Sequence, residues 1–144
     1  MGKKRVIIKK GRNVSGDVSA QIVSSISKKK IKEGRIYIHC SYNNTIITLT
    51  DSSGNVLYTT SSGAIGFNGA RKATPFAASK VSDTISDVAK RSGISEVEVF
   101  VKGVGSGRDS ALRSIANNEL EITFIKDVTP IPHNGCRRRK PKRN

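Results

Sequence analysis

The sequence predicts an α/β fold whose mixed β-sheet is assembled in the order β-β-β-α-β-α-β. Three observations predict it: residues 35–60 alternate apolar and polar side chains in three short segments, residues 75–92 carry an apolar stripe at helical spacing, and two further alternating segments flank a second helical one. Short links between the first three strands imply antiparallel pairing. Helical connections later in the chain imply parallel strands, joined by right-handed crossovers, with helices on the faces of the sheet.

The first three strands are expected to form a meander. Alternation within residues 35–40 places Ile36, Ile38 and Cys40 on one face and the intervening Tyr and His on the other. The turn between the second and third strands contains glycine, as tight strand connections often do. The predicted strands and turns alternate along residues 35–40, 41–44, 45–50, 51–55 and 56–60.

The first helix has the clearest local signals. Thr74 offers a side-chain N-cap, and Pro75 stands at the first helical position, where its missing N–H costs nothing. Gly93 is the expected stop after a helix that ends at Ser92. Its apolar stripe is formed by Ala77, Val81, Ile85, Val88 and Ala89.

The remaining elements are a strand, a glycine-containing loop at residues 103–108, a second helix and a final strand. Apolar residues at strand or helix spacing mark these elements: Val97, Val99 and Val101; then Ala111, Leu112, Ile115 and Ala116; then Ile122 and Phe124, which alternate in the last strand.

The formal net charge of +15 is concentrated at the two ends of the chain. Residues 1–34 carry +8, residues 35–127 carry +1 and residues 128–144 carry +6. We therefore expect a basic N-terminal extension, an α/β domain and a basic C-terminal tail, with a polyanion as the partner. Apolar residues at helical spacing within residues 18–26 also allow a short helix in the extension, as does a solvated arm that orders on a partner.

Several classes of protein are excluded by composition. No apolar stretch approaches the ~18–20 residues that a membrane helix requires. The first residues lack the apolar region of a signal peptide, so secretion is not indicated. The two cysteines, Cys40 and Cys136, lie far apart, which fits a reducing compartment better than a disulfide framework.

The glycine loop invites a nucleotide-binding interpretation, but its spacing fails. A dinucleotide motif that starts at Gly103 needs glycine at position 108, which is Arg108, and no phosphate-loop Gly-Lys-Ser/Thr follows. Two interpretations remain for the loop. Free N–H groups at the helix start, beside Arg108, can bind a phosphate, more plausibly of a polymer, or the loop is a tight turn without a ligand.

Enzyme and metal sites find little support. Glu96 and Glu98 share a strand face with Lys102 but lack the further acids of a two-metal nuclease. His39 and Cys40 are adjacent in a strand and point to opposite faces, so a zinc site with His133 and Cys136 is not expected. We expect no catalytic residue, metal or cofactor.

The basic residues of the domain are instead expected to lie near one another at one edge of the sheet. Arg71 and Lys72 precede the first helix, and Lys102 and Arg108 flank the glycine loop. If the parallel strands are neighbours, both helix N-termini lie at one edge of the sheet and form a platform for a polyanion. Few aromatics and no Trp argue against stacking of successive single-stranded bases, so backbone and shape recognition of folded RNA fits better.

Four segments, in order, resemble the small-subunit ribosomal protein eleven family, in its bacterial or organellar type. They are residues 41–51 (SYNNTIITLTD), 69–78 (GARKATPFAA), 101–108 (VKGVGSGR) and 127–137 (DVTPIPHNGCR). The chain departs from the family at Val104 and Ser106, where prolines are usual, and in its longer first 34 residues.

The resemblance implies a ribonuclease-H-like fold without catalytic acids. It implies a structural role in translation on the platform of the small ribosomal subunit, near the messenger exit and E site, in a bacterial cytoplasm or an organelle. Ribosomal RNA would be the main partner, with ribosomal proteins seven and eighteen as neighbours and initiation factor three and messenger RNA close by. The RNA-binding residues it implies, some of them also nominated by charge alone, are Asn43, Asn44, Arg71, Lys72, Lys102, Arg108, His133, Asn134, Arg137, Arg138, Arg139, Lys140, Lys142 and Arg143.

Overall fold

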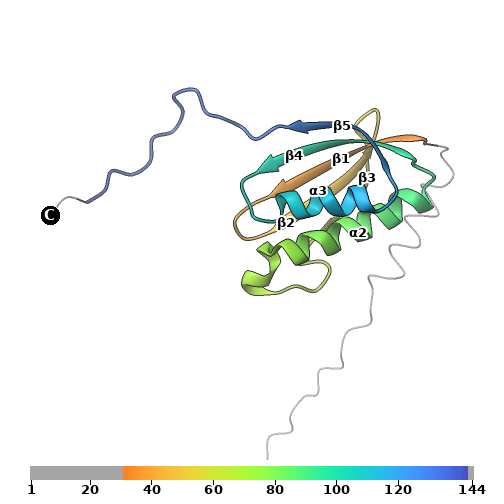
Figure 1. Cartoon of the computed structure of the whole chain (residues 1–144). Helices are drawn as coiled ribbons and strands as arrows, with labels where there is room; N and C mark the ends of the chain where they lie inside the picture. Colours follow the sequence, from red (N-terminus) through yellow and green to blue (C-terminus); the bar gives the residue numbers. More distant parts are fainter. Residues whose placement is uncertain (1–30, 143–144) are drawn as a thin grey trace, which may run out of the picture.

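The computed structural model describes residues 31–142 (Figure 1). The helix or arm expected within residues 18–26 therefore lies outside the described residues. The predicted order of elements is confirmed, with one addition, a short 3-10 helix before the first α-helix. The elements are β1 (Glu33–Cys40), β2 (Thr45–Asp51), β3 (Val56–Ser61), η1 (Gly69–Ala73), α2 (Pro75–Arg91), β4 (Glu96–Gly103), α3 (Arg108–Asn117) and β5 (Glu121–Asp127).

The five strands form one mixed sheet in the order β3-β2-β1-β4-β5. β1 pairs antiparallel with β2, and β2 pairs antiparallel with β3, as the short turns predict. β1 pairs parallel with β4, and β4 pairs parallel with β5. The first strand of the meander is therefore the centre of the sheet.

Both helices lie on the same face of the sheet, side by side (Figure 1). This arrangement is more specific than the expected one, which placed helices on the faces without assigning them. Ile36, Ile38 and Cys40 of β1 point into the core beneath the helices, whereas Tyr37 is partly exposed on the opposite, open face. Among helices of residues 31–142, none is long and apolar enough to cross a membrane.

Helix α2 begins where its sequence predicts and ends one residue before the expected Ser92, which caps it. The Ala77 N–H donates to the Thr74 hydroxyl oxygen at 3.2 Å, which caps the first turn behind Pro75. The helix ends at Arg91, and Gly93 follows with φ of +83°, a conformation that favours glycine. Every member of the predicted apolar stripe is buried.

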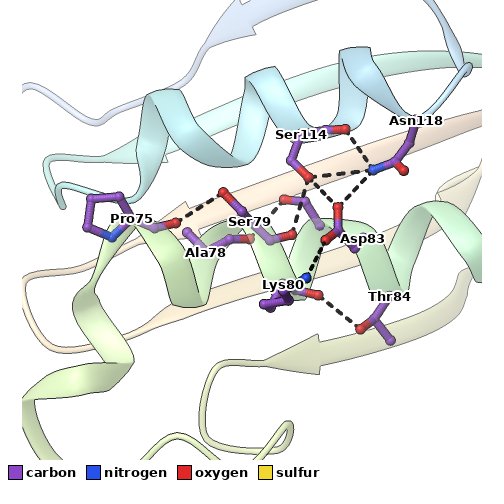
Figure 2. Close-up of polar contacts among 9 residues, drawn as sticks. Pro75, Ala78, Ser79, Lys80, Asp83, Thr84, Ser114 and Asn118 are labelled. Atoms are coloured by element: carbon purple, nitrogen blue, oxygen red, sulfur yellow. Dashed lines mark hydrogen bonds and ion pairs between the residues drawn. The ribbon is translucent and has the colours of Figure 1, made fainter.

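A polar cluster joins the two helices (Figure 2). Asp83 of α2 accepts hydrogen bonds from the Ser114 hydroxyl at 2.6 Å and from the Asn118 amide at 3.0 Å. Partial burial acts to raise the pKa of Asp83, but these hydrogen bonds outweigh it and hold the pKa below its usual value. The charged carboxylate is thus the form that links α2 to α3.

The predicted position of Phe124 on the core face of the sheet is wrong. The alternation predicts that Ile122 and Phe124 share a face, but the register between β4 and β5 shifts, so that Val97 pairs with Ile122 and Glu98 pairs with Phe124. The extra residue is a β-bulge, which turns Phe124 to the open face. There its ring meets that of Phe100 at 6.2 Å between centroids, and Phe100 stacks on Tyr37 at 5.0 Å.

Removing side-chain volume between α2 and the sheet is expected to destabilise the domain. Ile85 is fully buried, so Ile85→Ala should lower the free energy of unfolding by about 2–5 kcal/mol, measured by urea denaturation. Val56→Ala is the control, since Val56 is 62% exposed, and should change it by less than about 0.5 kcal/mol. Equal effects of the two changes would contradict this assignment of the core.

Candidate nucleic-acid interface

The three connections at one end of the sheet lie together and form what we call the loop edge: residues 41–44, 62–74 and 103–107. β1, β4 and β5 all run toward this end, and α2 and α3 both begin there (Figure 1). The predicted convergence of the two helix N-termini at one edge of the sheet is confirmed. The C-terminal tail leaves from the same end, directly after β5.

Direct hydrogen bonds hold the connections to one another. The Gly105 N–H donates to the Cys40 carbonyl at 3.1 Å, which joins the glycine loop to the end of β1. The Ser106 hydroxyl donates to the Ala73 carbonyl at 2.8 Å, which joins it to the residues before α2. The loop edge is therefore a continuous surface whose parts are fixed relative to one another.

Lack of space accounts for the glycines in residues 103–107. A Cβ at Gly103 would overlap the Cys40 carbonyl, and one at Gly105 would overlap the Ser41 carbonyl oxygen. A Cβ at Gly107 would lie 2.6 Å from the Cβ of Ala78 in α2. The tight-turn interpretation of this loop, which needs no ligand, is thus sufficient to explain its composition.

The predicted RNA-binding residues of the domain, which lie on or next to the loop edge, differ in their exposure and in their hydrogen bonding. Arg71 and Asn43 are exposed, Lys72 is half-buried, and Lys102 is exposed on the open face near the end of β4. Asn44 is built into the turn, because its backbone N–H donates to the Ser41 hydroxyl oxygen at 3.1 Å. Its side-chain oxygen is buried without a hydrogen-bond partner in the part of the chain that the structure describes.

The tail residues in the predicted set are exposed. His133, Asn134 and the basic residues from Arg137 to Lys142 follow β5 as an extended segment, whereas Arg143 lies outside the described residues. Asn134 has a positive φ of +55°, which asparagine tolerates better than most residues. The structure places Asn43, Asn44, Arg71 and Lys72 on the loop edge and Lys102 just before it on the open face, and it leaves the tail residues extended beyond the domain.

Arg108 has a role that its charge alone did not reveal. Its guanidinium donates to the Gly103 carbonyl at 2.9 Å, to the Thr129 hydroxyl at 3.2 Å and to the Asp127 carboxylate at 2.5 Å. The Thr129 hydroxyl also donates to Asp127 at 2.6 Å. Arg108, Asp127 and Thr129, which we call the tail clamp, thus tie the start of the tail to the glycine loop.

The tail clamp also changes the electrostatics at the start of α3. Hydrogen bonds from Arg108 and then Thr129 hold the pKa of Asp127 far below its usual range, and the same hydrogen bond to Asp127 raises the pKa of Arg108. Because the pKa of the carboxylate is lowered, its contribution to stability is present at neutral pH and is lost only as the solution becomes strongly acidic. With Asp109 in the first turn as well, this helix N-terminus already has anionic neighbours.

The acidic residues and cysteines that were considered for metal or thiol chemistry are placed as follows. Within residues 31–142, no group of three or more His, Cys, Asp or Glu side chains is placed to hold a metal ion. Glu98 instead pairs with Arg35 on the open face, at 2.7 Å. Cys40 is buried, as expected, and burial raises the pKa of its thiol, whereas Cys136 is exposed.

Two exposed aromatic residues, one on the loop edge and one next to it in α2, were not among the predicted site residues. Tyr42 is 77% exposed in the turn after β1, and Phe76 is 64% exposed in the first turn of α2. The signal for Phe76 was present in the sequence, because it directly follows the N-terminal Pro75 and falls outside the apolar stripe of its helix.

Comparison with known proteins gives a consistent result. The family model described as ribosomal protein S11 matches residues 34–143. A protein of Treponema pallidum (strain Nichols) named small ribosomal subunit protein uS11 is 53% identical over 116 residues, which cover 81% of this chain and 92% of that protein. The protein of the same name from Wigglesworthia glossinidia brevipalpis is 52% identical over 124 residues, covering 83% and 95% of the two chains.

Breaking the tail clamp is expected to loosen the root of the tail. The Val128 N–H donates to the Val101 carbonyl at 2.9 Å, next to the clamp, so amide hydrogen exchange at Val128 reports on it. Arg108→Gln and Asp127→Asn should each speed this exchange roughly two- to fivefold, and the double variant should add little. Lys102→Gln, a nearby exposed cation outside the clamp, is the control. An unchanged exchange rate at Val128 in Asp127→Asn would show that the clamp does not hold the start of the tail.

Proposed function

Because the chain belongs to the ribosomal protein S11 family, we propose that it binds small-subunit ribosomal RNA through its loop edge and C-terminal tail. As a member of that family it is a structural, non-enzymatic component of the small ribosomal subunit and serves translation. On the open face Glu33, Glu96 and Glu98 lie near one another, and Glu98 is paired with Arg35.

The observation that carries this proposal is the position of the unpaired cations. Arg71, Lys72 and Lys102 make no ion pair within residues 31–142 and lie at the edge from which the tail leaves. Arg35, Lys80, Lys90 and Arg108 each pair with a carboxylate, and the other unpaired cations of the described elements, Arg91, Arg113 and Lys126, are spread over α2, α3 and β5. Cations without internal partners are available to phosphates, and their fixed spacing can set the orientation of a folded RNA.

The tail adds attraction without needing a fixed shape. Its basic residues up to Lys142 are exposed, and no acidic residue follows Asp127 in the chain. Contacts between such a segment and phosphates release condensed counterions, which supports affinity independent of base sequence. The tail clamp sets the point on the loop edge from which this segment leaves the domain.

Finer placement rests on the family resemblance. We propose a position on the platform of the subunit, near the messenger exit and E site. Ribosomal proteins seven and eighteen would be neighbours, with initiation factor three and messenger RNA close by. Both relatives named above are bacterial, which supports a ribosome of the bacterial type.

Removing the tail charges is expected to reduce the salt dependence of RNA binding. Deletion of residues 137–143 removes six cations, so the slope of log K against log salt for small-subunit ribosomal RNA should flatten by up to ~4–5 if each contacts a phosphate. Filter binding across a range of about 50 to 200 mM salt would measure the slope. A slope equal to that of the full chain would refute the role of the tail.

One pair of cations just before α2 and one pair in its last turn test the loop edge. Arg71→Gln with Lys72→Gln should flatten the same slope by about 1.4–1.8, since two phosphate contacts are lost. Lys90→Gln with Arg91→Gln is the matched control, because these residues form the last turn of α2, at the far end of the sheet. Equal slopes for the two double variants would argue that binding reflects net charge rather than this surface.

A further inference from the structure

A hollow lies beside the loop edge, between the chain that follows β3 and the first turns of α2. Its volume is about 360 Å³, and it is lined by Ile65, Gly66, Phe67, Phe76 and Lys80. The rings of Phe67 and Phe76 meet edge to face, with centroids 6.0 Å apart and planes at 83°. Two walls of the hollow are therefore aromatic and mutually supported.

The exposure of Phe76 is not required by the fold. Helix α2 packs on the sheet through a different set of residues, among them Ala78, Val81 and Ile85, all fully buried. Phe76 is 64% exposed, and Ile65 beside it is 38% exposed. An aromatic ring displayed in this way at a hollow is typical of a surface that contacts another molecule.

The surroundings of the hollow are cationic. Lys80 places its ammonium group 5.9 Å from the centroid of the Phe76 ring, while its exposed pairing with Asp83 at 3.4 Å lies on the side toward α3 (Figure 2). Arg71 and Lys72 belong to the same connection, just before α2. None of the lining residues carries a carboxylate.

We propose that this hollow receives one unpaired base of the ribosomal RNA, stacked on Phe76, with the phosphates beside that base bound by the unpaired Arg71 and Lys72 of the same connection. The inference rests on the proposed function, because the hollow continues the cationic surface that would hold the RNA backbone. The hollow is shallow and open to solvent, which suits one face of a single base stacked on Phe76. Specific RNA recognition commonly uses unstacked bases of loops and bulges held against aromatic rings.

A nucleic acid explains the combination of features better than a protein side chain does. Aromatic walls alone would also fit a protein partner, but here they adjoin the unpaired cations of the loop edge, to which the phosphates of the RNA are proposed to bind. A base with its attached phosphate uses both features at once, through stacking and through charge.

Substitution of Phe76 distinguishes the contribution of base stacking to RNA affinity from the contribution of ionic contacts. Phe76→Ala should weaken binding to protein-free small-subunit ribosomal RNA about 5- to 150-fold at one salt concentration, while the salt slope stays unchanged because no ionic contact is lost. Phe76→Tyr, which keeps the aromatic face, should bind as the parent does. Phe124→Ala is the control, since Phe124 is 49% exposed on the open face, away from the hollow. Thermal unfolding of each variant verifies that it is folded.

The outcomes distinguish this proposal from the function on which it rests. Unchanged affinity in Phe76→Ala, together with a flatter slope in the Arg71/Lys72 double variant, would overturn the base-binding hollow and leave RNA binding at the loop edge standing. If neither variant changes binding, both proposals fail. Normal binding of Phe76→Ala to protein-free RNA with loss only during subunit assembly would assign the hollow to a protein and overturn the proposal.

Discussion

The close contact between the glycine loop and the end of β1 is the constraint on which the loop edge depends. Gly103 and Gly105 lie so near the backbone of Cys40 and Ser41 that no side chain fits, and Gly107 lies similarly near Ala78. This contact places the start of α3 beside the start of α2, because Ala78 belongs to the first turns of that helix. A side chain at any of these three positions would push the loop away from β1 or α2.

How far the sequence predicts the structure depends on the range of the interactions involved. The limits of α2 follow from Thr74, Pro75 and Gly93, whose effects act within a turn of the helix, and the structure matches them to within one residue. The predicted orientation of Phe124 is wrong because the bulge arises from the pairing of β5 with β4, and nothing in the sequence of β5 itself indicates it. The alternation of apolar and polar residues in a strand predicts which side chains face the core only when the strand pairs without a bulge.

The site shows the same division. The placement of the cations at one edge follows from strand and helix order, so Arg71 and Lys102 could be nominated before any geometry was known. Side-chain partners that are distant in the sequence could not be predicted in this way. Arg108 was predicted as an RNA contact, which stays a prediction, but its ion pair with Asp127 joins positions 19 residues apart and emerges only from the fold.

The two cysteines differ in a way that is useful in practice. Cys40 is buried beneath the helices, with a thiol pKa raised by burial, while Cys136 stands exposed in the basic tail. Because the thiolate is the reactive form, a maleimide dye should attach selectively at Cys136 in the native protein. The natural sequence thus carries its own labelling position, next to the segment whose encounter with RNA one would most wish to follow by fluorescence.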